Sequence, residues 1–113
     1  MIDIHSHILY GLDDGPRSVE ESLSMARAAV NDGISAVVCT PHWVETTYPN
    51  TRDIIIQRTK EFDHILKQQD IPLEIYPGAE LRLDIVLVEG IISKQLLTLN
   101  DTGAYALIEL PDV

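Results

Sequence analysis

The chain has 113 residues, of which 45% are hydrophobic, and a formal net charge of −10 at pH 7. This length predicts one small domain or part of a larger one, and the hydrophobic content suffices for a packed core. The strong negative charge disfavours nucleic-acid binding, which uses basic surfaces. No apolar run approaches the roughly 20 residues that span a bilayer, and no secretory signal is evident. We therefore expect a cytoplasmic protein without a membrane span.

The first third of the chain reads as a strand, a loop and a helix. Residues 1–4 are strand-like, and the stretch 7–17 is rich in Asp, Gly and Pro, which predicts a loop. Ser18 and Glu21 fit a capping box, in which each side chain satisfies an orphan backbone amide at a helix start. Gly33 suits the residue just past the end of this helix.

The rest of the chain also alternates between predicted strands and helices. The expected elements are a buried strand over 34–39, a loop over 40–49, a helix from about 50 or 51 to before Pro72, a strand over 73–76, a short helix around 85–89 within the ambiguous stretch 81–99, and a strand over 104–110. Cys39 lies inside a β-branched run, where a buried small residue is a better interpretation than a nucleophile.

This alternation of strands and helices predicts an α/β fold with a parallel sheet. Parallel strands that are buried on both faces read as continuous apolar runs. The runs 36–38 and 105–108 have this character, so we expect both to be fully covered.

Two histidines at the end of the first strand suggest a metal site. His5 and His7 are two positions apart, so in a strand their side chains point to the same face. His42, Glu80 and Glu109 follow or end later strands, and the carboxyl edge of a parallel sheet is where ligands bind. Imidazoles with carboxylates suit manganese, iron or zinc better than magnesium or calcium. The alternative is that the histidines cap strands and Glu80 lies on a solvated loop.

Four further side chains each allow two interpretations. Glu109 sits in an apolar strand, where a buried carboxylate costs several kcal/mol unless it is paired or metal-bound; otherwise it faces solvent. One interpretation of Asp14 is a turn residue whose negative charge interacts favourably with the dipole of the following helix. The alternative is a metal ligand or a proton-transfer group. Arg82 could meet an anionic substrate or form a surface ion pair. Trp43 walls a pocket or packs in the core, whereas His64 is expected on the surface.

Taken together, these motifs resemble a known superfamily. The set consists of His5-x-His7, Gly11-Leu12-Asp13-Asp14-Gly15-Pro16, Thr40-Pro41-His42, Pro77-Gly78-x-Glu80 and Leu97-Thr98-Leu99-Asn100-Asp101. It is similar to the polymerase and histidinol phosphatase (PHP) superfamily. Within that superfamily the chain most resembles the bacterial manganese-dependent protein-tyrosine phosphatases of capsular and exopolysaccharide operons.

The resemblance implies a distorted (β/α)7 TIM-like barrel, of which residues 1–113 would be the N-terminal portion of a single PHP-type domain. It implies two or three metal ions, Mn²⁺ or alternatively iron or zinc. The implied ligands are His5, His7, His42, Glu80 as the bridge, and Glu109. Asp14 corresponds to a ligand position used elsewhere in the superfamily. The family's later ligands, a histidine and an Asp-x-His pair, have no counterpart among these residues.

The implied activity is hydrolysis of phosphotyrosine on proteins, typically on a cognate bacterial tyrosine kinase. Cys39 is not followed by the Cys-x5-Arg spacing of cysteine phosphatases, so we expect hydrolysis by a metal-bound hydroxide. Asp14 and Arg82 are the expected catalytic side chains. The alternatives are another PHP-type metallohydrolase, such as a histidinol phosphatase, or an inactive fragment that acts only by binding. Exposed strand edges would favour self-association.

Overall fold

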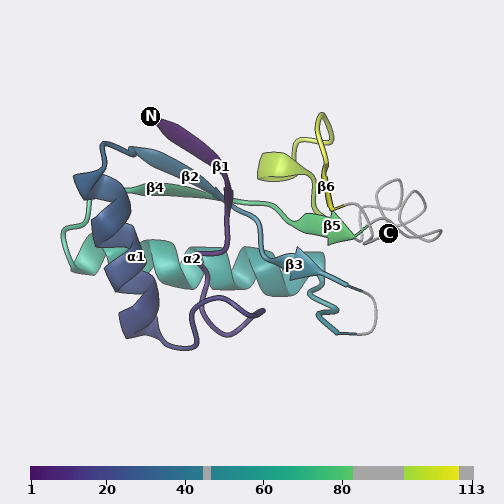
Figure 1. The fold of residues 1–113 in the computed structure, drawn as a ribbon, viewed down its shortest axis with the longest axis horizontal. Coiled ribbons are helices and arrows are strands. Elements are labelled where there is room, and N and C mark those ends of the chain that lie inside the picture. Colours follow the sequence, from purple (N-terminus) through teal and green to yellow (C-terminus); the bar gives the residue numbers. More distant parts are fainter. Residues whose placement is uncertain (45–46, 83–95, 110–113) are drawn as a thin grey trace.

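The computed structural model describes residues 1–44, 47–82 and 96–109, and it shows a mixed α/β fold whose strands pair in parallel (Figure 1). This confirms the predicted α/β class with parallel strands. The elements in chain order are β1 (Ile2–Ser6), α1 (Val19–Asn31), β2 (Ala36–Cys39), β3 (His42–Trp43), α2 (Arg52–Gln68), β4 (Glu74–Pro77), β5 (Glu80–Arg82), the 3-10 turn η1 (Leu99–Asp101) and β6 (Leu107–Glu109).

The strands form two three-stranded parallel sheets, in the orders β1-β2-β4 and β3-β5-β6. Thr40 and Pro41 alone separate β2 from β3, and Gly78 and Ala79 alone separate β4 from β5. Pro41 cannot donate to a ladder, but its carbonyl accepts a hydrogen bond of 3.0 Å from the backbone N–H of Glu80. The second sheet therefore begins just beyond the carboxyl ends of β2 and β4.

Helix α1 begins and ends where its capping residues predict. The Ser18 hydroxyl accepts a hydrogen bond of 3.2 Å from the Glu21 backbone N–H. The Glu21 carboxylate accepts a bond of 2.7 Å from the N–H of Arg17, one residue earlier than the standard capping box. Gly33 follows the C-cap with a φ of 84°, the left-handed conformation that glycine adopts without steric cost.

Helix α2 lies within its predicted bounds. The Thr51 hydroxyl caps it by accepting from the N–H of Ile54 at 3.3 Å, and the helix ends at Gln68. Ile55, Phe62 and Leu66 form its buried stripe, and Figure 1 shows both helices on the same side of the sheet β1-β2-β4. Within the described residues, no helix combines the length and apolarity needed to cross a membrane.

The prediction of a loop over 40–49 is wrong in part. His42 and Trp43 form β3, which pairs with Glu80 and Leu81 of β5. The proline before β3 interrupts the ladder only locally, so pairing resumes as soon as backbone N–H groups are present again. Trp43 is 8% exposed and belongs to the hydrophobic core, which supports its structural interpretation.

Burial along the two apolar runs differs from expectation in one case. All four residues of β2 are buried, as predicted. The run 105–108 is not covered, because Tyr105 is 76% and Ile108 is 43% exposed. Strand β6 pairs only with β5 in the part of the chain that the structure describes, so it is an edge strand there. Its described span, Leu107–Glu109, is shorter than predicted; the predicted helix around 85–89 and residue 110 lie outside the described residues.

The position of Phe62 makes a prediction about stability. Its ring is fully buried and meets Tyr10 edge-on, with centroids 6.0 Å apart. We expect Phe62→Ala to lower the free energy of unfolding by about 3–5 kcal/mol, because it removes a buried ring and leaves a cavity. Urea denaturation followed by circular dichroism measures this change. The exposed His64 on the same helix provides the control His64→Ala, expected within about 0.5 kcal/mol of wild type. Equal effects of the two substitutions would contradict the assignment of Phe62 to the core.

Candidate metal centre

The backbone brings the predicted ligands to one edge of the sheet. His5 lies near the end of β1, with His7 just beyond it. His42 and Glu80 are the first residues of β3 and β5 and are direct partners in the register of these strands. Glu109 ends β6. All five residues therefore lie at or beyond the carboxyl ends of the first sheet, where parallel α/β folds place their sites.

The first group of side chains contains His5, His7 and Glu80. The Nε2 atom of His5 lies 3.0 Å from Oε1 of Glu80, and Nε2 of His7 lies 3.2 Å from Oε2 of the same carboxylate. The two Nε2 atoms are 3.2 Å apart. Two imidazole nitrogens and both oxygens of one carboxylate thus lie around a space suited to one cation.

The second group shares Glu80 with the first. The Nδ1 atom of His42 lies 2.9 Å from Oε2 of Glu80 and 3.4 Å from Oε2 of Glu109. In each group, one candidate ligand atom per residue lies within 4.8 Å of the others. A carboxylate common to two such groups is positioned to bridge two ions.

The surroundings of Glu80 fit a metal ion. The residue is 9% exposed, and its Oε2 atom is buried without a hydrogen bond of acceptable geometry among the described residues. A buried carboxylate oxygen is costly unless a charge or a donor compensates it. The neighbouring imidazole nitrogens and carboxylates are the ligand types that divalent transition metals prefer. The residues present therefore fit such an ion.

Asp13 is a functional candidate that sequence reasoning missed. Its Oδ2 atom lies 2.9 Å from Nδ1 of His7 and accepts a bond of 2.9 Å from the backbone N–H of His42. Its Oδ1 atom accepts from the N–H of Gly15, also at 2.9 Å. With Nδ1–H of His7 donating to Asp13, the Nε2 lone pair of that ring points to Glu80, which is how carboxylates orient metal-binding histidines.

The contact between His7 and Asp13 shifts the pKa values of both side chains. The hydrogen bond with Asp13 raises the pKa of His7 above its ordinary value, against the opposing effect of burial. Burial alone would raise the pKa of Asp13, but hydrogen bonds from His7, His42 and Gly15 outweigh it and hold that pKa below its usual range. The pair is therefore ionised between these two pKa values. A bound metal ion would displace protons from ligands of this kind.

Asp13 could have been found from its turn. A Cβ atom on Gly15 would lie 2.8 Å from the carbonyl oxygen of His7, so the Asp-Asp-Gly turn packs directly against the histidine. The local sequence places Asp13 in a turn, and of the two adjacent aspartates it indicates a chemical role for Asp14 alone. Of the two aspartates, Asp13 is the one that pairs with His7, and its side chain is 0% exposed.

Asp14 and Arg82, the predicted catalytic side chains, lie at the rim of the site. The Asp14 side chain is 68% exposed, and its Oδ1 atom is 3.6 Å from Nε2 of His42. Arg82 follows Glu80 by two residues in β5 and is the register partner of Glu109. Both side chains line a small hollow next to His42. They are therefore near the candidate ligands, and their catalytic roles stay predictions.

Two other expectations are confirmed. His64 is exposed on α2 and far along the chain from the candidate ligands. Cys39 is fully buried, and burial raises the pKa of its thiol to about 12. A thiol with so high a pKa is a poor nucleophile at neutral pH.

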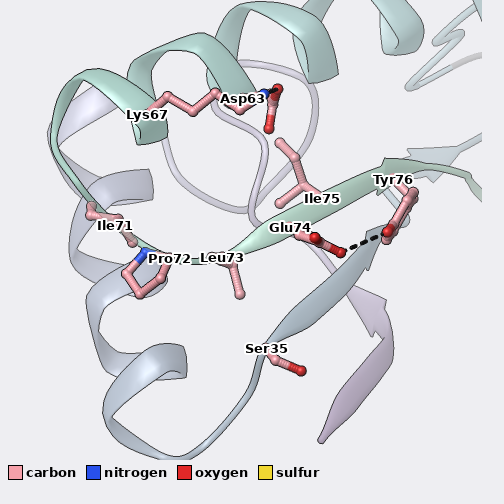
Figure 2. Close-up of a pocket in the computed structure, with 9 residues that line it drawn as sticks. All are labelled: Ser35, Asp63, Lys67, Ile71, Pro72, Leu73, Glu74, Ile75 and Tyr76. Atoms are coloured by element: carbon pink, nitrogen blue, oxygen red, sulfur yellow. Dashed lines mark hydrogen bonds and ion pairs between the residues drawn. The ribbon is translucent and has the colours of Figure 1, made fainter.

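A larger hollow, of about 750 Å³, lies at the other end of the sheet beside α2 and β4 (Figure 2). Four of its polar side chains form two pairs. Tyr76 donates to Glu74 at 2.8 Å, and Lys67 donates to Asp63 at 2.6 Å. None of the metal-competent groups among the described residues includes a residue of this hollow. Size alone therefore does not mark the site, and the chemistry points to Glu80.

The fold and the site define an α/β protein with a candidate multi-metal centre at the carboxyl edge of parallel strands. The sequence profile of the family described as "Capsular polysaccharide synthesis, CpsB/CapC" matches residues 1–113. The chain belongs to this family.

Individual relatives agree with this membership. The chain is 41% identical to the tyrosine-protein phosphatase YwqE of Bacillus subtilis over 98% of its own length and 43% of the relative. It is 38% identical to the tyrosine-protein phosphatase CpsB of Streptococcus agalactiae, over 96% of this chain and 44% of that protein. The chain spans less than half the length of these curated relatives.

A solved structure shares the fold closely. It comes from a study of YwqE from Bacillus subtilis and CpsB from Streptococcus pneumoniae, described there as unique metal-dependent tyrosine phosphatases. The match has a TM-score of 0.93 at 41% identity and covers 98% of this chain and 44% of the other.

The contacts of Asp13 predict a role in metal affinity. We expect Asp13→Asn to weaken Mn²⁺ binding by about tenfold to a hundredfold, the usual effect of removing a carboxylate that orients a ligating histidine. Isothermal titration calorimetry with Mn²⁺ measures the affinity. Asp70 is exposed, distant from the candidate centre and has a φ of 56°, which asparagine tolerates. Asp70→Asn is therefore the matched control and should bind Mn²⁺ as wild type does. Unchanged affinity in Asp13→Asn would refute the orienting role.

Proposed function

We propose that this chain is the N-terminal part of a metal-dependent protein-tyrosine phosphatase that acts in capsular polysaccharide synthesis. The observation that carries the proposal is the buried Glu80 carboxylate facing the imidazoles of three histidines. Membership of the CpsB/CapC family supports the biological context. The names of the relatives, and the description of the related solved structure as metal-dependent, support the reaction class.

The proposed metal centre uses the two groups that share Glu80. His5 and His7 with Glu80 would hold one ion, and His42 and Glu109 with Glu80 would hold a second. Manganese is the proposed metal, with iron and zinc as alternatives that the same ligand types accept. When bound, such ions lower the pKa of water and neutralise phosphate oxygens. Phosphate monoester hydrolysis needs both effects.

The remaining side chains would act on the substrate and on the ligands. Asp13 holds the ring of His7 in one tautomer and orientation. Asp14, beside Nε2 of His42, is placed to exchange a proton at the rim of the site. Arg82 would offset the negative charge of a phosphate entering past Glu109. The roles of Asp14 and Arg82 depend on position rather than on burial, since both side chains are at least partly accessible.

For the whole protein, we propose a distorted (β/α)7 barrel of which residues 1–113 form the first portion of one domain. Its later strands would supply the histidine and the Asp-x-His pair that the resemblance implies. The proposed substrate is a phosphotyrosine protein, a bacterial tyrosine kinase in particular, in the cytoplasm. Among the described residues, the edge strands β1 and β6 are where further strands would add.

The test is phosphate release from a phosphotyrosine peptide by the chain with Mn²⁺ and then with EDTA, beside a phosphoserine peptide. Release that depends on Mn²⁺ and is selective for phosphotyrosine would support the phosphatase activity, whereas no release would make these 113 residues an inactive fragment that lacks the later ligands. Glu80→Gln keeps the size of the side chain but removes the charge, so release should fall by at least about a hundredfold. The control Glu20→Gln changes an exposed glutamate in the first turn of α1 and should leave release unchanged.

Calorimetry with Mn²⁺ measures metal affinity independently of turnover. We expect the wild-type chain to bind Mn²⁺ and Glu80→Gln to abolish this binding. Release that persists in EDTA, or wild-type release by Glu80→Gln, would contradict the proposal.

A further inference from the structure

A small hollow of about 220 Å³ opens beside the second group of candidate ligands. His42, Tyr48, Arg82 and Glu109 are among the residues that line it. An apolar cavity of about 150 Å³ accepts a benzene ring, whereas pockets for drug-sized ligands start at roughly 300 Å³. The hollow is therefore sized for a single aromatic side chain.

The ring of Tyr48 forms an aromatic wall next to the candidate metal centre. It lies nearly parallel to the imidazole of His42, with an interplanar angle of 21° and a centroid distance of 6.0 Å. That imidazole is the one that faces Glu80 and Glu109. An aromatic group of a substrate would thus meet Tyr48 when its attached phosphate reaches these ligands.

The backbone around Tyr48 is held in place. Val44 and Tyr48 exchange two backbone hydrogen bonds of 3.0 and 2.9 Å, and the carbonyl of Tyr48 also accepts from the N–H of Asn50 at 2.8 Å. The buried side chain of Asn50 donates to the carbonyls of Leu12 and His42, both at 2.8 Å. The same asparagine therefore fixes the position of Tyr48 relative to His42.

The charges in the hollow favour one orientation of a bound aryl phosphate. Arg82 is the cationic side chain among the described lining residues, and it lies on β5 beside Glu109. Asp14 and Glu109 carry the negative charges, and Val44, Thr47 and Tyr48 are uncharged. A phosphate would be attracted to Arg82 and the candidate metal centre, so the attached ring is left to the uncharged side chains, of which Tyr48 is the aromatic one.

We propose that Tyr48 is a specificity-determining residue that packs against the phenyl ring of a substrate phosphotyrosine. This inference rests on the proposed phosphatase function and deepens it. Aromatic rings at such separations attract one another beyond simple burial of area. A phosphoserine side chain has no ring to occupy this side of the hollow, so Tyr48 contributes to phosphotyrosine binding and not to phosphoserine binding.

The experiment measures binding rather than turnover. Calorimetry with Mn²⁺ present compares a peptide carrying difluoromethylphosphono-phenylalanine, a non-hydrolysable phosphotyrosine analogue, with the same peptide carrying a phosphonate analogue of phosphoserine. Tyr48→Leu removes the ring and keeps an apolar side chain, so it should weaken binding of the aromatic peptide by about threefold to tenfold. Tyr48→Phe keeps the ring and should bind it as wild type does. Affinity for the serine analogue should be unchanged in both variants.

A separate Mn²⁺ titration distinguishes failure of the proposed role of Tyr48 from failure of the proposed phosphatase function. Wild-type affinity for Mn²⁺ in Tyr48→Leu shows that the metal centre is intact, so a loss of aromatic binding then reports on the ring. Unchanged aromatic binding in Tyr48→Leu, an equal loss in Tyr48→Phe, or a wild-type chain that binds both peptides equally would overturn the role of Tyr48 alone. A wild-type chain that takes up no Mn²⁺ would overturn the proposed function together with it.

Discussion

The burial of the Glu80 carboxylate is the constraint on which the candidate site depends. It is 9% exposed and lies within 3.2 Å of ring nitrogens of His5, His7 and His42. A charge in such a place is destabilising unless cations or protons compensate it. The register of β3 with β5 keeps Glu80 opposite His42, so the backbone holds the carboxylate where it needs a partner. A bound divalent cation would offset the desolvation penalty of this buried carboxylate.

The hydrophobic core supports the loop that orients the ligands. The Arg58 guanidinium on α2 lies 4.6 Å from the centroid of the Tyr10 ring and also donates to the Tyr10 carbonyl. Ser22 on α1 donates to the carbonyl of Ile8 at 2.6 Å. Both helices thus hold the segment that leads to Asp13, and Asp13 in turn orients His7. Substitutions that destabilise the core are therefore expected to displace the candidate ligands through this loop.

Local signals were enough for many elements and for the candidate ligands. The capping residues Ser18 and Thr51 and the glycine at position 33 mark helix ends through hydrogen bonds between near neighbours. The strand-like run before Cys39 is fully buried as its composition indicates. The gathering of the candidate ligands was predictable because parallel α/β topology brings the carboxyl ends of strands together. Strand β3 was missed because two residues after a proline carry too little periodicity to mark a strand.

The sequence by itself determined the alternation of both long helices with strands β1, β2, β4 and β6, the α/β class and the residue types that suit a metal. These properties depend on side-chain patterns within a few positions of one another. The tertiary structure alone decided that Asp13 rather than Asp14 contacts His7, that Tyr48 lies against His42, and that Tyr105 and Ile108 are exposed. Each of these depends on contacts between segments far apart in the chain, or on which neighbour a strand has. Spacing along the sequence carries no information about either.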